Sequence, residues 1–195
     1  SMVAKAIGAK SVVTPANKFG HDLNAMLSSI NNRTKLIFIA NPNNPTGTIL
    51  KDEELFEFLS KIPSSVIVVL DQAYFEYLDA DDNALDWLSK FNNLIITRTF
   101  SKAYGLAGLR VGYSLSSVEI AEYINRLRQP FNVSHIAQNA ATAALADQDF
   151  LASSIKSNYE GLAQLSNGFN RLGLRYIPSS ANFISLEVDD PNFVY

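Results

Sequence analysis

The sequence contains no cysteine, and this absence removes several kinds of chemistry at once. Disulfides, thiolate metal sites and cysteine nucleophiles are all excluded. Only two histidines are present, His21 and His135, and neither has the local spacing to other ligands that a metal site requires. We therefore expect no bound metal. No apolar run approaches the roughly 20 residues that a membrane-spanning helix needs.

An excess of one charge sign is also missing. The chain carries 16 Lys and Arg against 19 Asp and Glu, a formal net charge of −3, and charges of both signs are scattered along it. This distribution gives no basic stripe for nucleic acid and no polybasic segment for a membrane, so neither partner is expected. The N-terminus shows no basic segment followed by an apolar one, as a signal peptide would. The expected cytoplasmic location fits the lack of disulfides. At 195 residues and 47% hydrophobic, the chain can bury a substantial core.

Three short apolar runs, at residues 35–40, 66–70 and 94–97, are typical of strands buried on both faces of a parallel sheet. Between the first two, residues 52–59 begin with acidic side chains and continue with apolar ones at helical spacing. This alternation predicts an α/β fold with a mostly parallel sheet.

The pattern changes after a further predicted strand at residues 109–113. Helical spacing then predicts three helices, around residues 120–127, 135–146 and 155–169, followed by strands at 174–177 and 183–188. We therefore assign residues 1–155 to a large domain and residues 156–195 to the beginning of a smaller α+β domain.

Both ends of the chain have an unfinished pattern. Residues 1–8 have the spacing of the end of a helix without a capping signal, and residues 11–14 are strand-like. At the other end, the strand pattern stops only a few residues before Tyr195. We expect that the chain is cut from a longer protein and that both domains are incomplete.

Polar side chains gather where the apolar runs end, which is where open α/β sheets bind their ligands. Residues 41–47 read Asn-Pro-Asn-Asn-Pro-Thr-Gly, residues 71–74 read Asp-Gln-Ala-Tyr, and residues 99–102 read Thr-Phe-Ser-Lys. Alone, each segment has a plain structural explanation, since Asn-Pro stretches are usually turns, an Asp after a strand usually caps a helix, and a lone Lys is usually a surface charge. Their order on successive strand ends is what indicates a site.

In this order the segments resemble the fold-type I aminotransferases that depend on pyridoxal 5′-phosphate (PLP), in particular the histidinol-phosphate aminotransferases. The resemblance rests on Ser-Lys-x-x-Gly-x-x-Gly-x-Arg-x-Gly at residues 101–112 and Asn-Pro-x-Asn-Pro-Thr-Gly at residues 41–47, and it covers most of the chain. It implies the large domain of that fold, a three-layer α/β/α arrangement around a mostly parallel sheet, with PLP as cofactor.

The same resemblance implies roles for individual residues. PLP needs an amine to form a Schiff base, and Lys102 is the matching lysine and the catalytic proton carrier. The pyridine nitrogen needs a carboxylate to stay protonated, and Asp71 matches that position. Tyr74 and Asn44 match the groups that bind the phenolic oxygen of the cofactor; a core tyrosine with a satisfied hydroxyl is the alternative for Tyr74.

For the cofactor phosphate, Arg110 supplies a planar bidentate donor, and Thr99 and Ser101 supply hydroxyls with no preference between them. The candidate substrate contacts are Asn44, Asn132 and Asn182. Asn132 has an equal alternative as part of a helix N-cap region, and Asn182 lies in an Ala-Asn-Phe segment similar to one in the family.

The chain also departs from the family, because it lacks the early phosphate-binding segment and the C-terminal arginine for the substrate carboxylate. We therefore expect these residues alone to bind PLP weakly. Three functions stay open: amino-group transfer between L-glutamate and imidazole-acetol phosphate in histidine biosynthesis; another fold-type I aminotransferase or PLP lyase; and a non-catalytic dimerisation fragment. Family members are usually homodimers, so we expect a homodimer that acts on amino acids and 2-oxo acids.

Overall fold

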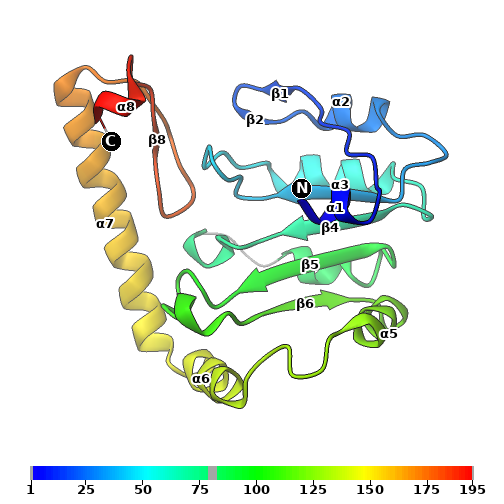
Figure 1. Cartoon of the computed structure of the whole chain (residues 1–195). Coiled ribbons are helices and arrows are strands. Elements are labelled where there is room, and N and C mark those ends of the chain that lie inside the picture. The colour runs from blue at the N-terminus through cyan, green and yellow to red at the C-terminus, as the bar shows by residue number, and fades with distance from the viewer. Residues whose placement is uncertain (1, 79–82, 195) are drawn as a thin grey trace.

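A four-stranded sheet forms the centre of the protein, in the order β3-β4-β5-β6. The structure is a computed structural model that describes residues 2–78 and 83–194. Strands β3 (Leu36–Ala40), β4 (Ile67–Asp71) and β5 (Leu94–Thr99) are parallel, and β6 (Gly112–Ser116) pairs antiparallel with β5. The parallel strands therefore end at a common edge, and the segments that follow them meet there (Figure 1).

The remaining elements surround this sheet. The helices are α1 (Met2–Ala6), α2 (Leu23–Ser28), α3 (Asp52–Ser60), α4 (Asn83–Trp87), α5 (Val118–Leu127), α6 (His135–Ala146), α7 (Gln148–Leu172) and α8 (Pro191–Val194), with 3-10 turns η1 (Phe75–Tyr77) and η2 (Ala107–Leu109). Two small antiparallel pairs complete the fold, β1 (Ala16–Asn17) with β2 (Gly20–His21) and β7 (Tyr176–Ile177) with β8 (Ser185–Leu186). None of the helices in the described part of the chain is long and apolar enough to cross a membrane.

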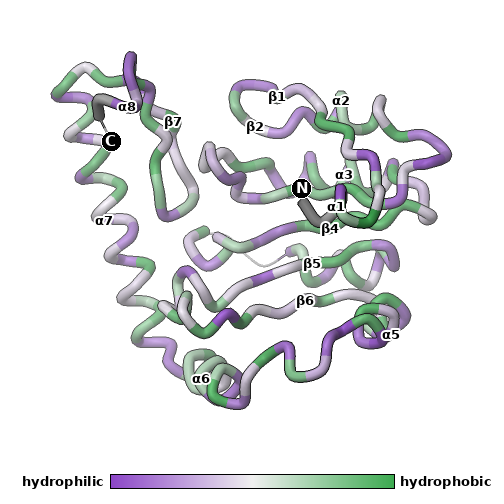
Figure 2. Tube along the Cα trace, viewed as in Figure 1, coloured by the Kyte–Doolittle hydropathy of each residue, from purple (hydrophilic) through white to green (hydrophobic). Residues whose placement is uncertain are grey.

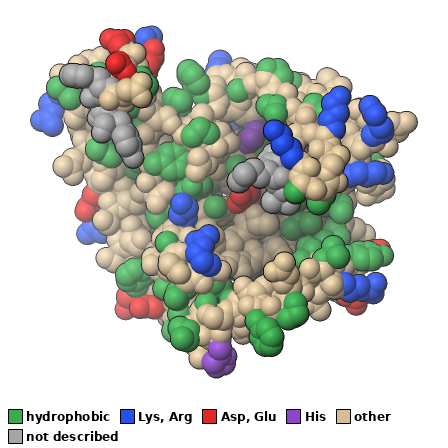
Figure 3. Space-filling view, viewed as in Figure 1, with side chains coloured by type: hydrophobic (Ala, Val, Ile, Leu, Met, Phe, Trp, Pro, Cys, Tyr) green, Lys and Arg blue, Asp and Glu red, His purple; other side chains and the backbone are tan. Residues whose placement is uncertain are grey.

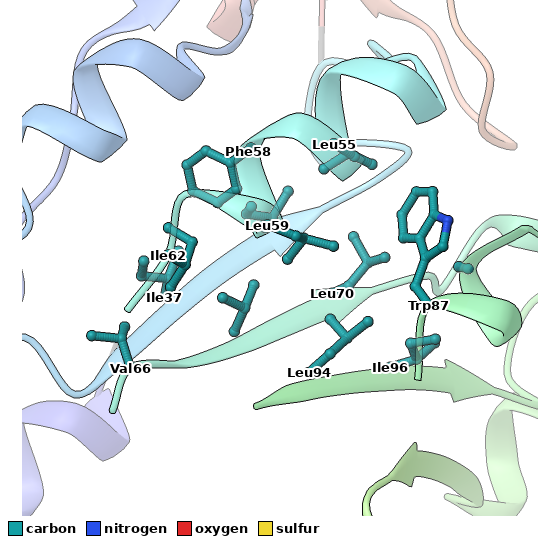
Figure 4. Packing of buried hydrophobic residues seen from close by; sticks show 13 residues of the cluster. Ile37, Leu55, Phe58, Leu59, Ile62, Val66, Leu70, Trp87, Leu94 and Ile96 are labelled. Atoms are coloured by element: carbon teal, nitrogen blue, oxygen red, sulfur yellow. The ribbon is translucent and has the colours of Figure 1, made fainter. Parts of the chain in front are cut away.

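The main core lies between the sheet and helices α3 and α4. Figure 4 shows Phe58 and Leu59 of α3 and Trp87 of α4 directed toward the apolar side chains of the strands. Successive side chains of a strand point to opposite faces, so alternate residues such as Ile39 and Leu70 enter this core. Three acidic side chains in the first turn of α3 favour the helix start, because they face its positive dipole end.

The opposite face of the sheet is much more open. Leu36 and Phe38, which alternate with the core residues of β3, are 48% and 66% exposed. Strand β3 is also one edge of the sheet among the described residues. Figure 3 shows that this face is hollowed over the sheet.

Helix α7 lies beyond the carboxyl ends of β4 and β5 (Figure 1). Hydrophobic and hydrophilic residues alternate along it (Figure 2). The Tyr159 hydroxyl of α7 donates a hydrogen bond to the Tyr77 carbonyl at the end of η1, 3.0 Å away. The helix ends at Gly173, whose φ of 68° closes it in the left-handed conformation that glycine adopts without strain.

The predicted α/β class with a mostly parallel sheet is confirmed. The three apolar runs form β3, β4 and β5, and the segment between the first two forms α3. The strand predicted at residues 109–113 instead begins at Gly112, because Arg110 takes a left-handed conformation, with φ of 53°, that a strand cannot contain. The prediction for residues 11–14 was wrong; these residues are irregular and mostly exposed, and they run into Pro15, which donates no backbone hydrogen bond. The proposed domain boundary at residue 155 falls inside α7 and stays a prediction.

The β1–β2 pair is fixed to the sheet through His21. The ring nitrogen Nε2 of His21 donates to the Ala40 carbonyl at the end of β3, 3.1 Å away. Burial lowers the pKa of His21 from 6.5, and this effect exceeds the opposite effect of the hydrogen bond.

We expect the free energy of unfolding to fall as the pH is lowered below 6.5. The unfolded chain binds the His21 proton more tightly than the folded chain, so acid favours unfolding in this window. Urea denaturation at several pH values measures this, and His21→Gln should remove the His21 part of the dependence. His135→Gln, at an exposed position, is the matched control and should retain it. Equal pH profiles for both variants would contradict the assignment.

Candidate active site

The loop after β3 has a fixed shape that presents Asn44 at the carboxyl edge of the sheet. The buried Asn41 side chain accepts a hydrogen bond from the Leu50 amide at 2.8 Å and donates to the Leu50 carbonyl at 3.3 Å. Asn43 Nδ2 donates to Thr46 Oγ1, 2.7 Å away. The peptide bonds before Pro42 and Pro45 are cis. The polar side chains of this loop therefore hold the loop itself, except for Asn44, which projects toward the next strand end.

Asn44, Tyr74 and Lys102 come together from three separate strand ends. Asn44 Nδ2 donates to the Tyr74 hydroxyl at 2.8 Å, and Lys102 Nζ lies 5.3 Å from the centroid of the Tyr74 ring. Tyr74 is only 4% exposed, and its ring packs edge-on against Phe183 at 5.4 Å. The Tyr74 hydroxyl is thus held at the surface of the site by a buried ring.

Asp71 is the last residue of β4, and its carboxylate lies on the open face of the sheet. Its Oδ1 accepts a hydrogen bond from the Ala73 amide at 3.1 Å, which fixes one oxygen. The residue is exposed, so the carboxylate is accessible to a ligand. In the sheet register Asp71 lies beside Thr97 of β5, the strand that leads to Lys102.

Arg110 and Ser101 are also brought together. Arg110 Nη1 donates to Ser101 Oγ at 3.3 Å and to the Ala107 carbonyl at 2.8 Å. The Ser101 amide donates to Thr99 Oγ1 at 3.1 Å. One cation and two hydroxyl groups therefore lie beside Lys102, and they are the donor types that bind a phosphate.

The segment after β7 packs against the Asn44 loop. The Ser180 amide donates to the Gly47 carbonyl at 2.8 Å, and the Ser185 hydroxyl donates to the Pro45 carbonyl. Asn182 is exposed in this segment, and its side chain reaches Tyr77. Burial raises the pKa of Tyr77, while hydrogen bonds with Ser154 and Asn182 act in the opposite direction.

Asn132 has a different environment. It is exposed and accepts a hydrogen bond from Arg128 Nη1 at 3.2 Å. Nearby, Ser134 caps α6 by accepting from the Ala137 amide at 3.2 Å, as the N-cap alternative predicts for this region. Among the interactions found in residues 2–78 and 83–194, none links Asn132 to Lys102.

The chain as a whole matches a known protein family. Residues 1–192 match the family described as aminotransferase class I and II. The chain belongs to that family. Among this family's members, histidinol-phosphate aminotransferase 2 of Pseudomonas fluorescens is 54% identical over 189 residues, which are 96% of this chain and 51% of that protein. Histidinol-phosphate aminotransferase 1 of Psychrobacter arcticus is 56% identical over 190 residues, 96% of this chain and 50% of that protein.

Solved structures agree with these sequence relatives. The crystal structure of histidinol-phosphate aminotransferase from Sinorhizobium meliloti in complex with pyridoxal-5′-phosphate is similar, with a TM-score of 0.88 and 34% identity. That similarity covers 96% of this chain and 51% of the other. The chain thus spans about half the length of the class I and II aminotransferases that it matches.

Several residues that shape the candidate site were not named from the sequence. Gln72 and Arg98 are hydrogen-bonded to each other on the face of the sheet opposite the Asp71 carboxylate. Ser179, Ser180 and Ser185 lie against the Asn44 loop. Gln72 had a detectable signal, because it continues the inward alternation of Val68 and Leu70 and so places a polar side chain in the core. The serine contacts carry no local signal, since their partners are more than 130 residues away.

Gly47 offers a direct test of the contact between the loop and the C-terminal segment. Its φ is +72°, and a Cβ added there would lie 2.9 Å from Ser179 Cα and nearer still to the Ser179 side chain. We expect Gly47→Ala to lower the free energy of unfolding by about 2–3 kcal/mol, from backbone strain plus steric overlap.

Gly8→Ala is the matched control for this prediction. Gly8 has a φ of +71°, but nothing lies within 4 Å of its added Cβ, so it should show the backbone cost alone. Urea denaturation measures both variants. Equal losses would show that Ser179 does not press against residue 47.

Proposed function

We propose that the protein containing this chain is a PLP-dependent aminotransferase that moves an amino group between L-glutamate and imidazole-acetol phosphate, forming histidinol phosphate. The names of relatives at 54% and 56% identity support this substrate pair. The observation that carries the proposal is the convergence of Lys102, Tyr74 and Asn44 from three strand ends.

The residues present fit PLP as the cofactor. The set offers an amine in Lys102, a carboxylate in Asp71, a hydroxyl and amide pair in Tyr74 and Asn44, and a cation with hydroxyls around Arg110. These match the aldehyde, the pyridine nitrogen, the phenolic oxygen and the phosphate of PLP, in that order. No other group is needed to account for the donor types.

The roles of the residues follow from their chemistry. When bound, PLP supplies an electron sink that stabilises negative charge at the α-carbon of the substrate. Lys102 Nζ would take the proton from that carbon, because it is a flexible amine within the cluster. Asp71 would hold a proton on the pyridine nitrogen, and the Tyr74 hydroxyl, fixed by Asn44, would orient the phenolic oxygen.

The remaining assignments are part of the same proposal. Arg110, Ser101 and Thr99 would hold the phosphate, and Asn44 and Asn182 would contact the substrate. Asn132 stays a prediction. We also propose a homodimer in the cytoplasm that takes small amino acids and 2-oxo acids, with a large domain in residues 1–155 and a smaller one beginning at residue 156.

The test is a transamination assay on the full gene product loaded with PLP. Histidinol phosphate and 2-oxoglutarate should give glutamate at a higher kcat/KM than aromatic amino acids with the same acceptor. A preference for aromatic donors would favour another aminotransferase of this fold. PLP binding without any transfer would contradict the proposal.

A further inference from the structure

We propose that Arg98 is a positioning residue that holds the Asp71–Tyr74 segment through the side chain of Gln72. This inference rests on the proposed PLP-dependent function and adds a residue to it. Arg98 lies on β5, one residue before Thr99, and on the face of the sheet away from the Asp71 carboxylate. Arg98 would therefore affect the cofactor site from the opposite face of the sheet, without contacting the cofactor.

Arg98 is held by two hydrogen bonds to Gln72 and by a cation–π contact with Phe75. Arg98 Nε and Nη2 both donate to Gln72 Oε1, at 3.0 and 2.7 Å. The Arg98 guanidinium also lies 4.0 Å from the centroid of the Phe75 ring. A planar guanidinium that is hydrogen-bonded in its plane and stacked on its face has little freedom to rotate. Gln72 is 6% exposed, so a lost partner could not be replaced by bulk water.

Main-chain hydrogen bonds of Gln72 connect the Arg98 contact to the candidate active site. Its amide donates to the Thr97 carbonyl at 2.9 Å, and its carbonyl accepts from the Phe75 amide at 3.1 Å. Asp71 comes directly before it, and Tyr74 lies inside the turn that the second bond closes. Fixing Gln72 on both its main chain and its side chain thus fixes the directions of the Asp71 carboxylate and the Tyr74 ring.

The Arg98–Gln72 hydrogen bonds also join the two strands that lead to the main proposed cofactor contacts. Gln72 follows β4, the strand of Asp71, whereas Arg98 belongs to β5, which leads to Lys102. Chemical groups that must act on one ligand from two strands need a fixed separation. Arg98 and Gln72 supply a side-chain link at the point where the ladder between β4 and β5 ends.

The test uses Arg98→Met, Gln72→Leu and the double variant, each made in the full gene product. Arg98→Met and Gln72→Leu remove the hydrogen bonds from opposite sides while keeping similar side-chain lengths. We expect each to weaken PLP binding and to lower kcat by about tenfold, because a buried polar group loses its partner. KM for the amino donor should change by less than about twofold, since neither residue reaches the substrate.

Two further measurements separate positioning from a merely structural role. The pH at which the absorbance of bound PLP changes should shift in both variants, because the carboxylate opposite the ring nitrogen is displaced. The double variant should resemble the single ones rather than add their losses, as expected for two residues of one interaction. Arg126→Met is the control, because Arg126 is 70% exposed on α5 and should leave all values unchanged.

The outcomes are distinct. A wild-type protein that binds no PLP would overturn the proposed function itself. If the wild type binds PLP and both single variants keep its affinity, kcat and spectral pH dependence, the role of Arg98 is refuted. Should Arg98→Met fail to fold, Gln72→Leu alone decides, and unchanged PLP affinity in that variant overturns the inference.

Discussion

Lys102→Ala is expected to abolish covalent capture of PLP and to lower transamination by at least about 10³-fold. Lys102 Nζ is the amine held next to the Tyr74 ring, 5.3 Å from its centroid, in the centre of the candidate site. The proposed reaction needs this amine both to attach the cofactor and to carry the α-proton. Borohydride reduction of the PLP-loaded protein, followed by peptide mass spectrometry, measures the attachment.

Lys156→Ala is the control for this experiment. The Lys156 side chain is 78% exposed on α7, so its loss should change neither PLP capture nor turnover. Labelling of a peptide other than the one containing residue 102 would show that the lysine has been assigned wrongly. Normal turnover by Lys102→Ala would contradict the proposed mechanism as a whole.

Asp71→Asn is expected to lower kcat by about 10²–10³-fold while PLP still binds. An amide is similar in size to a carboxylate and can accept the same bond from the Ala73 amide, so the end of β4 should keep its shape. It cannot stabilise a protonated ring nitrogen, because it carries no negative charge. Steady-state kinetics and the absorbance spectrum of the bound cofactor test this together.

The matched control is Asp86→Asn, which removes a carboxylate from an exposed position on α4. It should leave kcat and the spectrum unchanged. A full-activity Asp71→Asn protein would mean that another group keeps the ring nitrogen protonated.

The central sheet was predictable because its signal is local. Short, nearly continuous apolar runs identify β3, β4 and β5 within a residue or two, although the expected burial on both faces is wrong for β3, whose Leu36 and Phe38 are exposed. The spacing of Leu55, Phe58 and Leu59 identifies α3. The start of the antiparallel strand β6 was predicted too early. It depends on the left-handed backbone conformation of Arg110, which cannot be predicted from the residue type.

The candidate site was predictable in its members and less so in its contacts. Asn44 and Tyr74 were both named, and they form a hydrogen bond across 30 positions of sequence. Arg98 was not named, because its role depends on the register between β4 and β5 and on the Gln72 side chain. Such pairings are set by tertiary packing, and a single sequence carries little information about them.

The open face of β3 and its position at the edge of the sheet have a consequence for handling these 195 residues as an isolated polypeptide. Within residues 2–78 and 83–194 no further strand pairs with the outer side of β3, and Leu36 and Phe38 are exposed on its open face, so this strand can add strands from another molecule or collect apolar surfaces in solution. Light scattering from such a preparation should therefore rise with protein concentration, and mild detergent should reverse the rise before it affects helical content.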